Sequence, residues 1–415
     1  MKRYLLWSLV IFFSLVVGYL IVCSWRGMAH SQKAYTKEGL LEASRIDPSN
    51  PDPFQKLGLL HQWDLLQIDL TESFRYFSKA IERNPLEQEY WIGLARIFQR
   101  MGEHDAFERA LGNAILVFPT SYRGRWISGN LLLQGGALEE ALPHFSYILS
   151  HYPDRSNLVY EVSRKAVDDP DFILERLIPR DASSLNQYLT YLYEVGDKKS
   201  AKKVWATLAS LDYQAERHET IRYIDFLIAS GEMTEAAEIW RAKLREEGLA
   251  VPSDRNPVTN GGFEKDEVLG GGFDWRIRTV SGAEISMDHD VAFEGKRSLK
   301  VAFNGEENVD FHHVYQIVPL KPDTNYLLTA HMRTEAVTTK SGLMIEVLGL
   351  GSAFRSASDP LTGDNGWTEL AVPFQTPIQS QGGMIRVRRQ KTDKFDRFIS
   401  GTVWVDNVQV IERSK

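Results

Sequence analysis

The sequence has little cysteine, no basic excess and none of the common catalytic signatures. Its single cysteine, Cys23, excludes an internal disulfide framework and a zinc site built on cysteines. The formal net charge of -7 argues against a nucleic-acid binder, which usually presents a basic face. The sequence contains no Gly-x-Ser-x-Gly elbow, His-Glu-x-x-His helix or phosphate-binding loop. These absences predict that the protein is not an enzyme and binds no nucleic acid.

Long apolar runs are also rare, because only residues 4–22 form an uncharged segment of membrane-spanning length. At a rise of about 1.5 Å per residue, a helix over this run crosses roughly 30 Å of hydrocarbon. Lys2 and Arg3 precede it and favour a cytoplasmic N-terminus. We therefore predict that residues 1–29 form a cytoplasmic stub, a transmembrane anchor and a short linker, and that the rest of the chain lies outside the cytoplasm.

Two alternatives concern processing of this segment. A Gly27-Met28-Ala29 triplet offers small residues for signal-peptidase cleavage, but the apolar run is longer than the roughly 7–15 residues of a usual signal core. Cys23 follows Val22 rather than the small residue that a bacterial lipoprotein signal requires. We favour an uncleaved single-pass anchor in a bacterial inner membrane, with the bulk of the chain periplasmic.

The next part of the chain repeats itself. Pro85, Pro119 and Pro153 are spaced by 34 residues, and each unit carries two apolar stripes with helical spacing. Further along, three residues recur after 35 positions, so that Gly196, Ala201 and Trp205 are matched by Gly231, Ala236 and Trp240. Period and residue pattern resemble the tetratricopeptide-repeat family, and we predict an α-solenoid of such helix pairs over residues 30–250. Breaks at Asp168-Asp169-Pro170 and Ile178-Pro179 indicate one degenerate unit.

The resemblance implies how such an array works. Each helix pair buries its apolar stripe by stacking on its neighbour, which leaves a concave surface. In this family that surface usually holds a peptide or a partner protein and carries no catalytic groups. The large aromatic residues of the repeats are then packing residues: Trp91, Phe107, Trp205 and Trp240.

Residues 251–415 follow a different pattern. After a linker containing Pro252 and Pro257, helical periodicity gives way to the alternation of strands, punctuated by glycine, proline and asparagine. We predict strands over these runs: 299–303, 326–332, 343–348, 369–374, 384–389 and 402–411. Six or more antiparallel strands in this length predict a β-sandwich of the jelly-roll type. The expected fold class is thus multidomain α + β.

Several short motifs in this region carry a second resemblance. They are Asn260-Gly261-Gly262-Phe263-Glu264, Gly272-Phe273-Asp274-Trp275, the stretch 293–301, the stretch 315–322, Gly366-Trp367 and Val403-Trp404-Val405-Asp406-Asn407-Val408. In this order they resemble the galactose-binding-like jelly-roll carbohydrate-binding modules of polysaccharide-acting proteins. The resemblance implies a structural Ca²⁺, with Glu264 and Asp406 as carboxylate ligands and carbonyl oxygens near Glu294 and Gly295 completing the shell. The alternative is that both carboxylates cap turns by hydrogen bonding.

Strand alternation yields a candidate glycan site. If the apolar residues of the strand at 326–332 point inward, the polar residues between them point outward. The same reasoning applied to neighbouring strands predicts one shared outer face made of His313, Tyr315, His331, Arg333, Glu346, Arg386 and Arg388. Hydrogen-bonding groups beside an aromatic ring suit sugar hydroxyls, and arginines favour an acidic glycan. The alternative is an ordinary solvated face.

Together these features predict a membrane-anchored, non-catalytic adaptor. Its repeats would bind a protein partner, and its sandwich would bind a glycan or dock in an envelope assembly, as in bacterial exopolysaccharide or cell-envelope polysaccharide assembly. One alternative is a glycan-processing enzyme with its active site in the jelly roll. The other is a purely structural sandwich.

Overall fold

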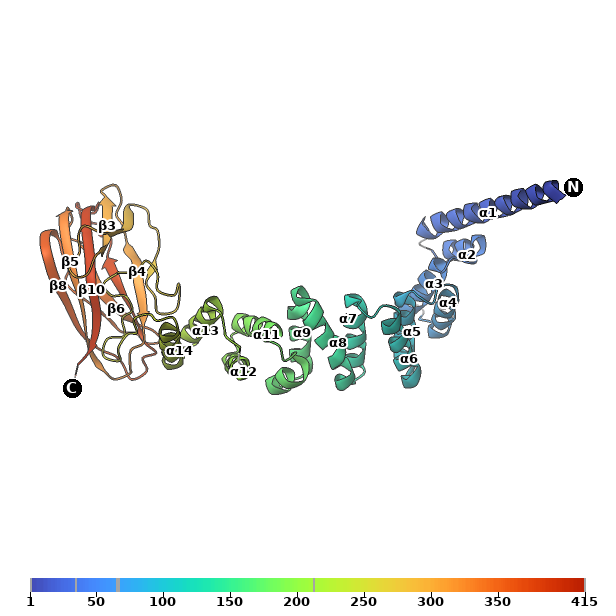
Figure 1. The fold of residues 1–415 in the computed structure, drawn as a ribbon, viewed down its shortest axis with the longest axis horizontal. Helices are drawn as coiled ribbons and strands as arrows, with labels where there is room; N and C mark the ends of the chain where they lie inside the picture. Colours follow the sequence, from blue (N-terminus) through green and yellow to red (C-terminus); the bar gives the residue numbers. More distant parts are fainter. Residues whose placement is uncertain (1, 34–35, 65–67, 212, 414–415) are drawn as a thin grey trace. The chain divides into compact units, whose positions relative to one another are not determined.

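The computed structural model describes residues 2–33, 36–64, 68–211 and 213–413. The chain divides into two compact units, Met1–Leu211 and Asp212–Lys415. The first unit is helical, and the second holds two antiparallel sheets preceded by a helix pair. The predicted fold class is confirmed (Figure 1).

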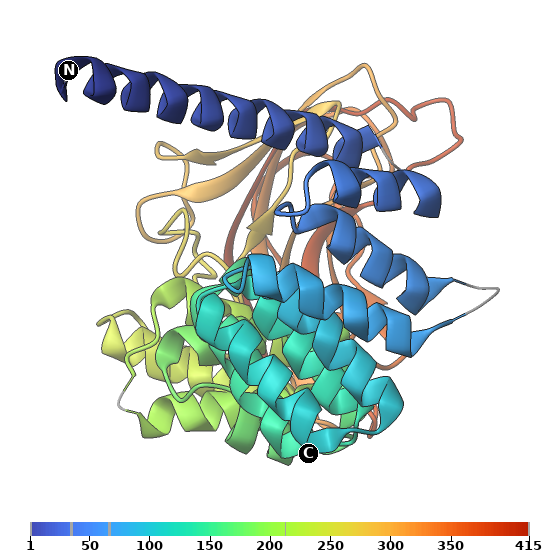
Figure 2. The ribbon, with the colours of Figure 1, turned by 90° about the vertical axis from the view of Figure 1, so that its right-hand side faces the viewer.

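The N-terminal apolar segment is one continuous helix, α1 (Lys2–Lys33). Its section Leu9–Ala29 is long and apolar enough to cross a membrane or to serve as a signal sequence, and its side chains are mostly exposed. The end of α1 lies beside α2 (Figure 2). There Ser31 is fully buried and its carbonyl accepts a 2.6 Å hydrogen bond from Lys56 Nζ. A Cβ added at Gly27 would lie 2.2 Å from Cβ of Asp47, so α1 contacts the residue that follows α2 at this glycine.

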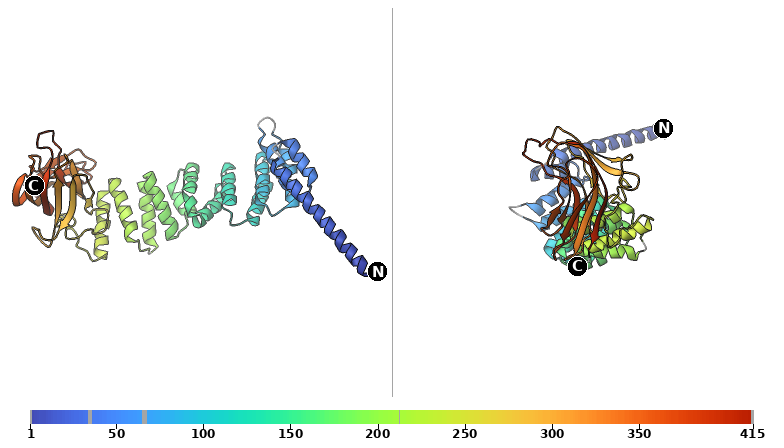
Figure 3. Two further views of the ribbon diagram at one scale, coloured as in Figure 1. Left: turned by 90° about the horizontal axis from the view of Figure 1, so that it is seen from above. Right: turned by 90° about the vertical axis from the view of Figure 1, so that its left-hand side faces the viewer.

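Antiparallel helix pairs follow α1 and stack in chain order (Figure 3). The helices are α2 (Lys37–Ile46), α3 (Asp52–Trp63), α4 (Leu70–Arg83), α5 (Gln88–Met101), α6 (His104–Val117), α7 (Tyr122–Gln134) and α8 (Leu138–His151). Glycines set the spacing between them. A Cβ at Gly58 or at Gly93 would come within 2.7 Å or 2.2 Å of the ring of Phe77. Helices α3 and α5 therefore pack on either side of one aromatic ring, which explains why a small residue recurs here.

The helices are irregular after Pro153, where the sequence predicted a break in the regular pattern. A 3-10 turn (η1, Pro153–Arg155) leads into α9 (Ser156–Ala166), and the short α10 (Pro170–Phe172) runs into a π-helical turn (η2, Ile173–Leu177). Pro170 begins that segment because proline fits a first helical turn, and an extended Ile178 ends it before Pro179. Regular helices resume with α11 (Ala182–Val195) and α12 (Lys198–Ser210).

The last helix pair belongs to the second unit, where it packs on the sandwich. Helix α13 spans Arg217–Ala229 and α14 spans Met233–Glu246. Trp240 of α14 is 2% exposed and meets the Phe273 ring edge-on, with the ring centroids 6.0 Å apart. Its indole N–H donates to the hydroxyl of Thr259 at 3.3 Å. Trp240 is thus a packing residue, as predicted, but a loop of the β-domain covers it. Stacked arrays need such a cap on their last apolar face.

Two five-stranded antiparallel sheets form the sandwich (Figure 1). Sheet A has the order β1-β4-β9-β6-β7, and its strands are Arg276–Ile277, Phe311–Val318, Gly383–Arg389, Met344–Gly349 and Arg355–Ala357. Sheet B has the order β2-β3-β10-β5-β8, and its strands are Ala283–Asp288, Ser298–Asn304, Ser400–Glu412, Asn325–Val337 and Gly363–Gln375. Each predicted strand has a counterpart, and alternate residues such as Leu299, Val301 and Phe303 fill the core between the sheets.

Candidate functional site

The outer face of sheet A carries a row of polar and aromatic side chains across three strands. Arg386 of β9 pairs in register with Tyr315 of β4 on one side and with Glu346 of β6 on the other. Residues directly opposite in an antiparallel sheet share a face, so the three side chains lie side by side. We call Tyr315, Arg386 and Glu346 the Arg386 row. The sequence placed all three outward, and their strands bring them together.

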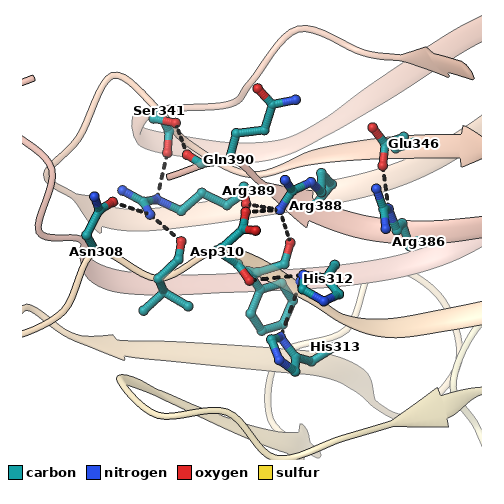
Figure 4. Close-up of polar contacts among 12 residues, drawn as sticks. Asn308, Asp310, His312, His313, Ser341, Glu346, Arg386, Arg388, Arg389 and Gln390 are labelled. Carbon is teal, nitrogen blue, oxygen red and sulfur yellow. Dashed lines mark hydrogen bonds and ion pairs between the residues drawn. The ribbon is translucent and has the colours of Figure 1, made fainter. Parts of the chain in front are cut away.

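Glu346 is the unusual member of the row because its side chain is fully buried on an outer face. One carboxylate oxygen accepts from Nε of Arg386, and the other accepts from Nε of Arg355 on β7 (Figure 4 shows the Arg386 contact). The Arg386 side chain is 19% exposed and that of Arg355 is 49% exposed. Each guanidinium therefore uses Nε on the carboxylate and keeps its other N–H donors for different partners. Both cations are fixed in place before any ligand arrives.

Apolar surface adjoins the row on the same face. The Arg278 guanidinium lies 5.3 Å from the centre of the half-buried Tyr315 ring. One register step further along the strands, Ile317 pairs with Met384, and Met384 pairs with Leu348. A fixed set of N–H donors beside an aromatic ring and an aliphatic strip can contact both the hydroxyls and the C–H faces of a sugar.

A second polar group lies at the far end of strands β4 and β9 (Figure 4). Arg388 donates to the carboxylate of Asp310 and to the carbonyl of Phe311. Burial alone would raise the pKa of Asp310, but the bond from Arg388 outweighs it and the pKa lies below its usual value. His313 stacks on His312 with a centroid distance of 4.6 Å. Burial, and the neighbouring His312, lower the pKa of His313.

Sequence reasoning missed Arg389, which organises the loops beside this group (Figure 4). Its side chain is fully buried and donates to the carbonyls of Val309, Ser341 and Arg397, the latter two at 2.9 Å and 2.8 Å. It also reaches Oδ1 of Asn308 at 3.3 Å. A desolvated guanidinium held by neutral oxygens has a lowered pKa, here chiefly because of burial. The alternation that sends Arg386 and Arg388 outward was the available signal, since it sends Arg389 toward the core.

The expectation that all seven candidate residues share one face is wrong. His331 and Arg333 lie on β5, which belongs to sheet B. There His331 stacks on Phe293 at 3.6 Å between centroids, and Arg333 lies 5.2 Å from the Trp404 ring. Alternation tells which residues of a strand face outward, but it does not tell which of two sheets the strand joins. Only His313, Tyr315, Glu346, Arg386 and Arg388 remain together on sheet A.

The residues predicted to hold a cation meet at one turn. The buried carboxylate of Asp406 accepts the backbone N–H groups of Phe293 and Glu294 at 2.8 Å and 3.1 Å. Glu264 accepts the N–H of Lys296 at 2.8 Å, and its carboxylate lies where a Cβ of Gly295 would be. Burial, and then the like charge of Glu264, raise the pKa of Asp406 despite those N–H bonds. Two carboxylates that repel each other suit a hard cation, but both accept backbone N–H groups, and the described residues hold no cluster of three or more His, Cys, Asp or Glu side chains that could bind a metal.

The chain matches no protein-family profile, and no curated protein sequence matches it. Among solved structures, it is similar to the CBM22-1 xylan-binding domain of Xyn10C from Paenibacillus barcinonensis (15% identity, 34% of this chain and 86% of that domain, TM-score 0.26). It is also similar to a xylan-binding domain from CBM 22 (16% identity, 39% and 97%, TM-score 0.28). A third structure is TmCBM61 in complex with β-1,4-galactotriose (14% identity, 39% and 100%, TM-score 0.27). At these identities the likeness concerns the fold alone.

Proposed function

We propose that this protein is a non-catalytic adaptor anchored in the membrane, which binds polysaccharide through the outer face of sheet A and a partner protein through its helix pairs. The setting that we propose is exopolysaccharide or cell-envelope polysaccharide assembly outside the cytoplasm. The helix pairs are proposed to be tetratricopeptide units. Their period of 34 residues and the contacts of Gly58 and Gly93 with the Phe77 ring support this.

One observation carries the glycan proposal: the fully buried carboxylate of Glu346 fixes two arginines on an outer sheet face beside Tyr315. An outer face normally leaves its charged side chains mobile in water. Here the guanidinium groups are held in one geometry, so little side-chain entropy is lost when they bind hydroxyl or carboxylate groups. A net positive charge remains after Glu346 is paired with Arg355 and Arg386, and it favours an acidic sugar.

The absence of turnover is part of the proposal. A glycosidase needs two carboxyl groups flanking the scissile bond, one of them protonated at working pH. The carboxyl groups of this face are Glu346 and Asp310, and both accept hydrogen bonds from arginine. The bond from Arg388 stabilises the ionised form of Asp310, and the pKa of Asp310 is below its usual value. Asp310 is therefore poorly suited to act as the acid, and the Glu346 side chain is fully buried behind its two arginine partners.

The glycan proposal is tested with the detergent-solubilised full chain by calorimetric titration with soluble xylan, β-1,4-galactotriose and a polyuronate. Binding without release of reducing sugar is expected for wild type, and R386Q should weaken it about tenfold or more, as the loss of a charge-assisted hydrogen bond implies. R333Q is the matched control, since Arg333 also lies on an outer face but in sheet B. Equal weakening by R333Q, or reducing ends produced by wild type, would overturn the proposal.

A further inference from the structure

A groove in the first unit lies against helices α3, α5 and α7, which are the first helices of three successive pairs. Its volume is about 420 Å³. The lining residues come from the end of α3, the second half of α5 and much of α7: Trp63, Arg96, Gln99, Arg100, Trp126, Ile127, Asn130, Leu131 and Gln134. The glycan proposal does not use this groove.

The groove is cationic. It contains Arg96 and Arg100, whereas no carboxylate is among its lining residues. With the residues that the structure describes, Arg96 forms no ion pair, because the nearby Glu89 is held by Arg123 at 2.5 Å. Burial, and to a lesser degree the charge of Arg123, lower the pKa of Arg96. Arg100 donates to the carbonyl of Gln62 at 2.8 Å, which leaves its charge unneutralised as well.

Two tryptophans form the apolar part of the groove. Trp63 is 59% exposed, an unusual state for so large an apolar side chain, and the Arg100 guanidinium lies 5.8 Å from its ring. Trp126 is fixed by stacking on Tyr122 at 6.3 Å and by an edge contact with Phe145 at 5.9 Å. Tryptophan and arginine are among the residue types that dominate binding energy at protein interfaces.

Amide side chains complete the lining. Gln99 donates to the carbonyl of Leu131 at 2.6 Å, and Asn130 donates to that of Trp126 at 2.7 Å. These bonds use the NH₂ groups, and no described residue donates a hydrogen bond to either amide oxygen. Such oxygens can accept the N–H groups of a peptide backbone.

We propose that this groove binds an acidic segment of a partner protein, in which an aspartate or glutamate stands next to an aromatic or long aliphatic residue. The carboxylate would pair with Arg96 and Arg100, the apolar side chain would pack on Trp63 and Trp126, and the backbone would bond to Gln99 and Asn130. This proposal rests on the protein-binding role proposed above and supplies the chemistry of its partner.

The test is an array of octapeptides in matched pairs, probed with the detergent-solubilised full chain. One member of each pair carries Asp or Glu beside Phe, Trp or Leu, and the other carries Asn or Gln in place of each acid. Wild type should bind acidic members at least tenfold better, and R96Q should weaken them about ten- to hundredfold, as expected for bonds to charged groups. Raised salt should weaken wild type more than R96Q.

R109Q is the matched control, because Arg109 is exposed on α6 and is absent from the groove lining. R96Q should melt no lower than wild type, since Arg96 has no ion pair to lose, and R100Q repeats the test independently. If neutral and acidic peptides bind equally well, the partner segment is not selected for its acidity, although the protein-binding role still stands. If R96Q and R100Q bind the peptides as wild type does, this groove is not the binding site. If no peptide binds at all, both the groove proposal and the protein-binding role are contradicted. None of these results affects the glycan titration.

Discussion

Glu346 and Arg386 lie opposite each other on strands β6 and β9, and the carboxylate is completely withdrawn from water although it sits on the outer face of the sheet. Arg355 binds its second oxygen from β7, so one carboxylate joins three neighbouring strands. A buried carboxylate is tolerated only when it is paired and hydrogen-bonded. This pairing makes the face rigid.

The E346Q variant tests how much the Glu346 carboxylate contributes to the stability of the sandwich. Its neutral amide leaves Arg355 and Arg386 without an anion, and we expect the free energy of unfolding to fall by about 1–3 kcal/mol, as for a broken, partly buried pair. Denaturant unfolding measures the loss. E335Q is the control, because Glu335 is an exposed residue of sheet B and should change stability by less than about 0.5 kcal/mol. Equal effects of the two variants would contradict the bracing role of Glu346.

Calcium should stabilise the second unit through Glu264 and Asp406. The pKa of Asp406 is raised, so its ionised form is disfavoured in the folded state. Without a cation, this penalty on stability is therefore fully present above the folded pKa of Asp406, and it is relieved as the pH falls through that pKa toward the unfolded value. A bound Ca²⁺ would compensate both carboxylates, and at 100 times its Kd it adds about 2.7 kcal/mol. Thermal melts at pH 7 in CaCl₂ and in EDTA measure the difference.

E264Q is the variant for that measurement, and D288N is its control. Asp288 is held by the Trp404 indole at 2.8 Å and by Lys300 at 3.3 Å, and it accepts the N–H groups of Asp290 and Val291 in the same loop. Its substitution therefore controls for a change in this loop that removes neither proposed ligand. We expect the response to Ca²⁺ to vanish in E264Q and to persist in D288N. A melt that is the same in CaCl₂ and EDTA for wild type would leave Asp406 and Glu264 as caps of the turn.

His144 should make the first unit sensitive to acid. Burial, and then the charge of Arg125, lower the pKa of His144 to about 4, against about 6.5 in an unfolded chain. The folded state therefore favours the neutral ring. Its contribution is fully present above about pH 6.5 and is lost as the pH falls toward 4. Between pH 7 and 4.5, wild type should lose about 2 kcal/mol more than H144L. H151L, at an exposed position of the same helix, should titrate like wild type.

The Trp240 contact predicts a large stability effect. W240A would leave a cavity between α14 and Phe273 and should lower the free energy of unfolding by about 3–5 kcal/mol. W63A removes an exposed tryptophan, 59% accessible, and should cost far less. Calorimetry that gives similar losses for both variants would contradict the capping role of the β-domain loop.

The anchor should be retained in the mature protein. Cleavage after Ala29 would cut a continuous helix two residues before the fully buried Ser31, whose carbonyl binds Lys56. Proteases act on extended, accessible segments rather than docked helices. Intact mass measurement on membrane-extracted protein should therefore include residues 1–29. A chain beginning at His30 would show that the segment is a cleaved signal.

Local pattern predicted much of this fold. Repeat spacing located the helix pairs, and alternation placed Glu346, Arg386 and Arg388 outward, because both signals depend on residues close in sequence. The burial of Glu346 was not predictable, since it depends on Arg355 from a three-residue strand too short to show alternation. His331 and Arg333 were assigned to the wrong sheet for a related reason, as sheet membership depends on long-range pairing. The groove lined by Arg96 and Arg100 was missed because the repeat period fixes the order of the helices but not which polar side chains lie beside one another on successive pairs.

Because Trp240 and Phe273 bury each other, the linker near Pro252 is not a suitable boundary for an expressed fragment. A fragment that starts there would expose the Phe273 ring to solvent and favour aggregation. A helical fragment that ends there would expose the Trp240 indole. Anyone grafting the sandwich onto another scaffold should carry α13 and α14 with it as one cassette.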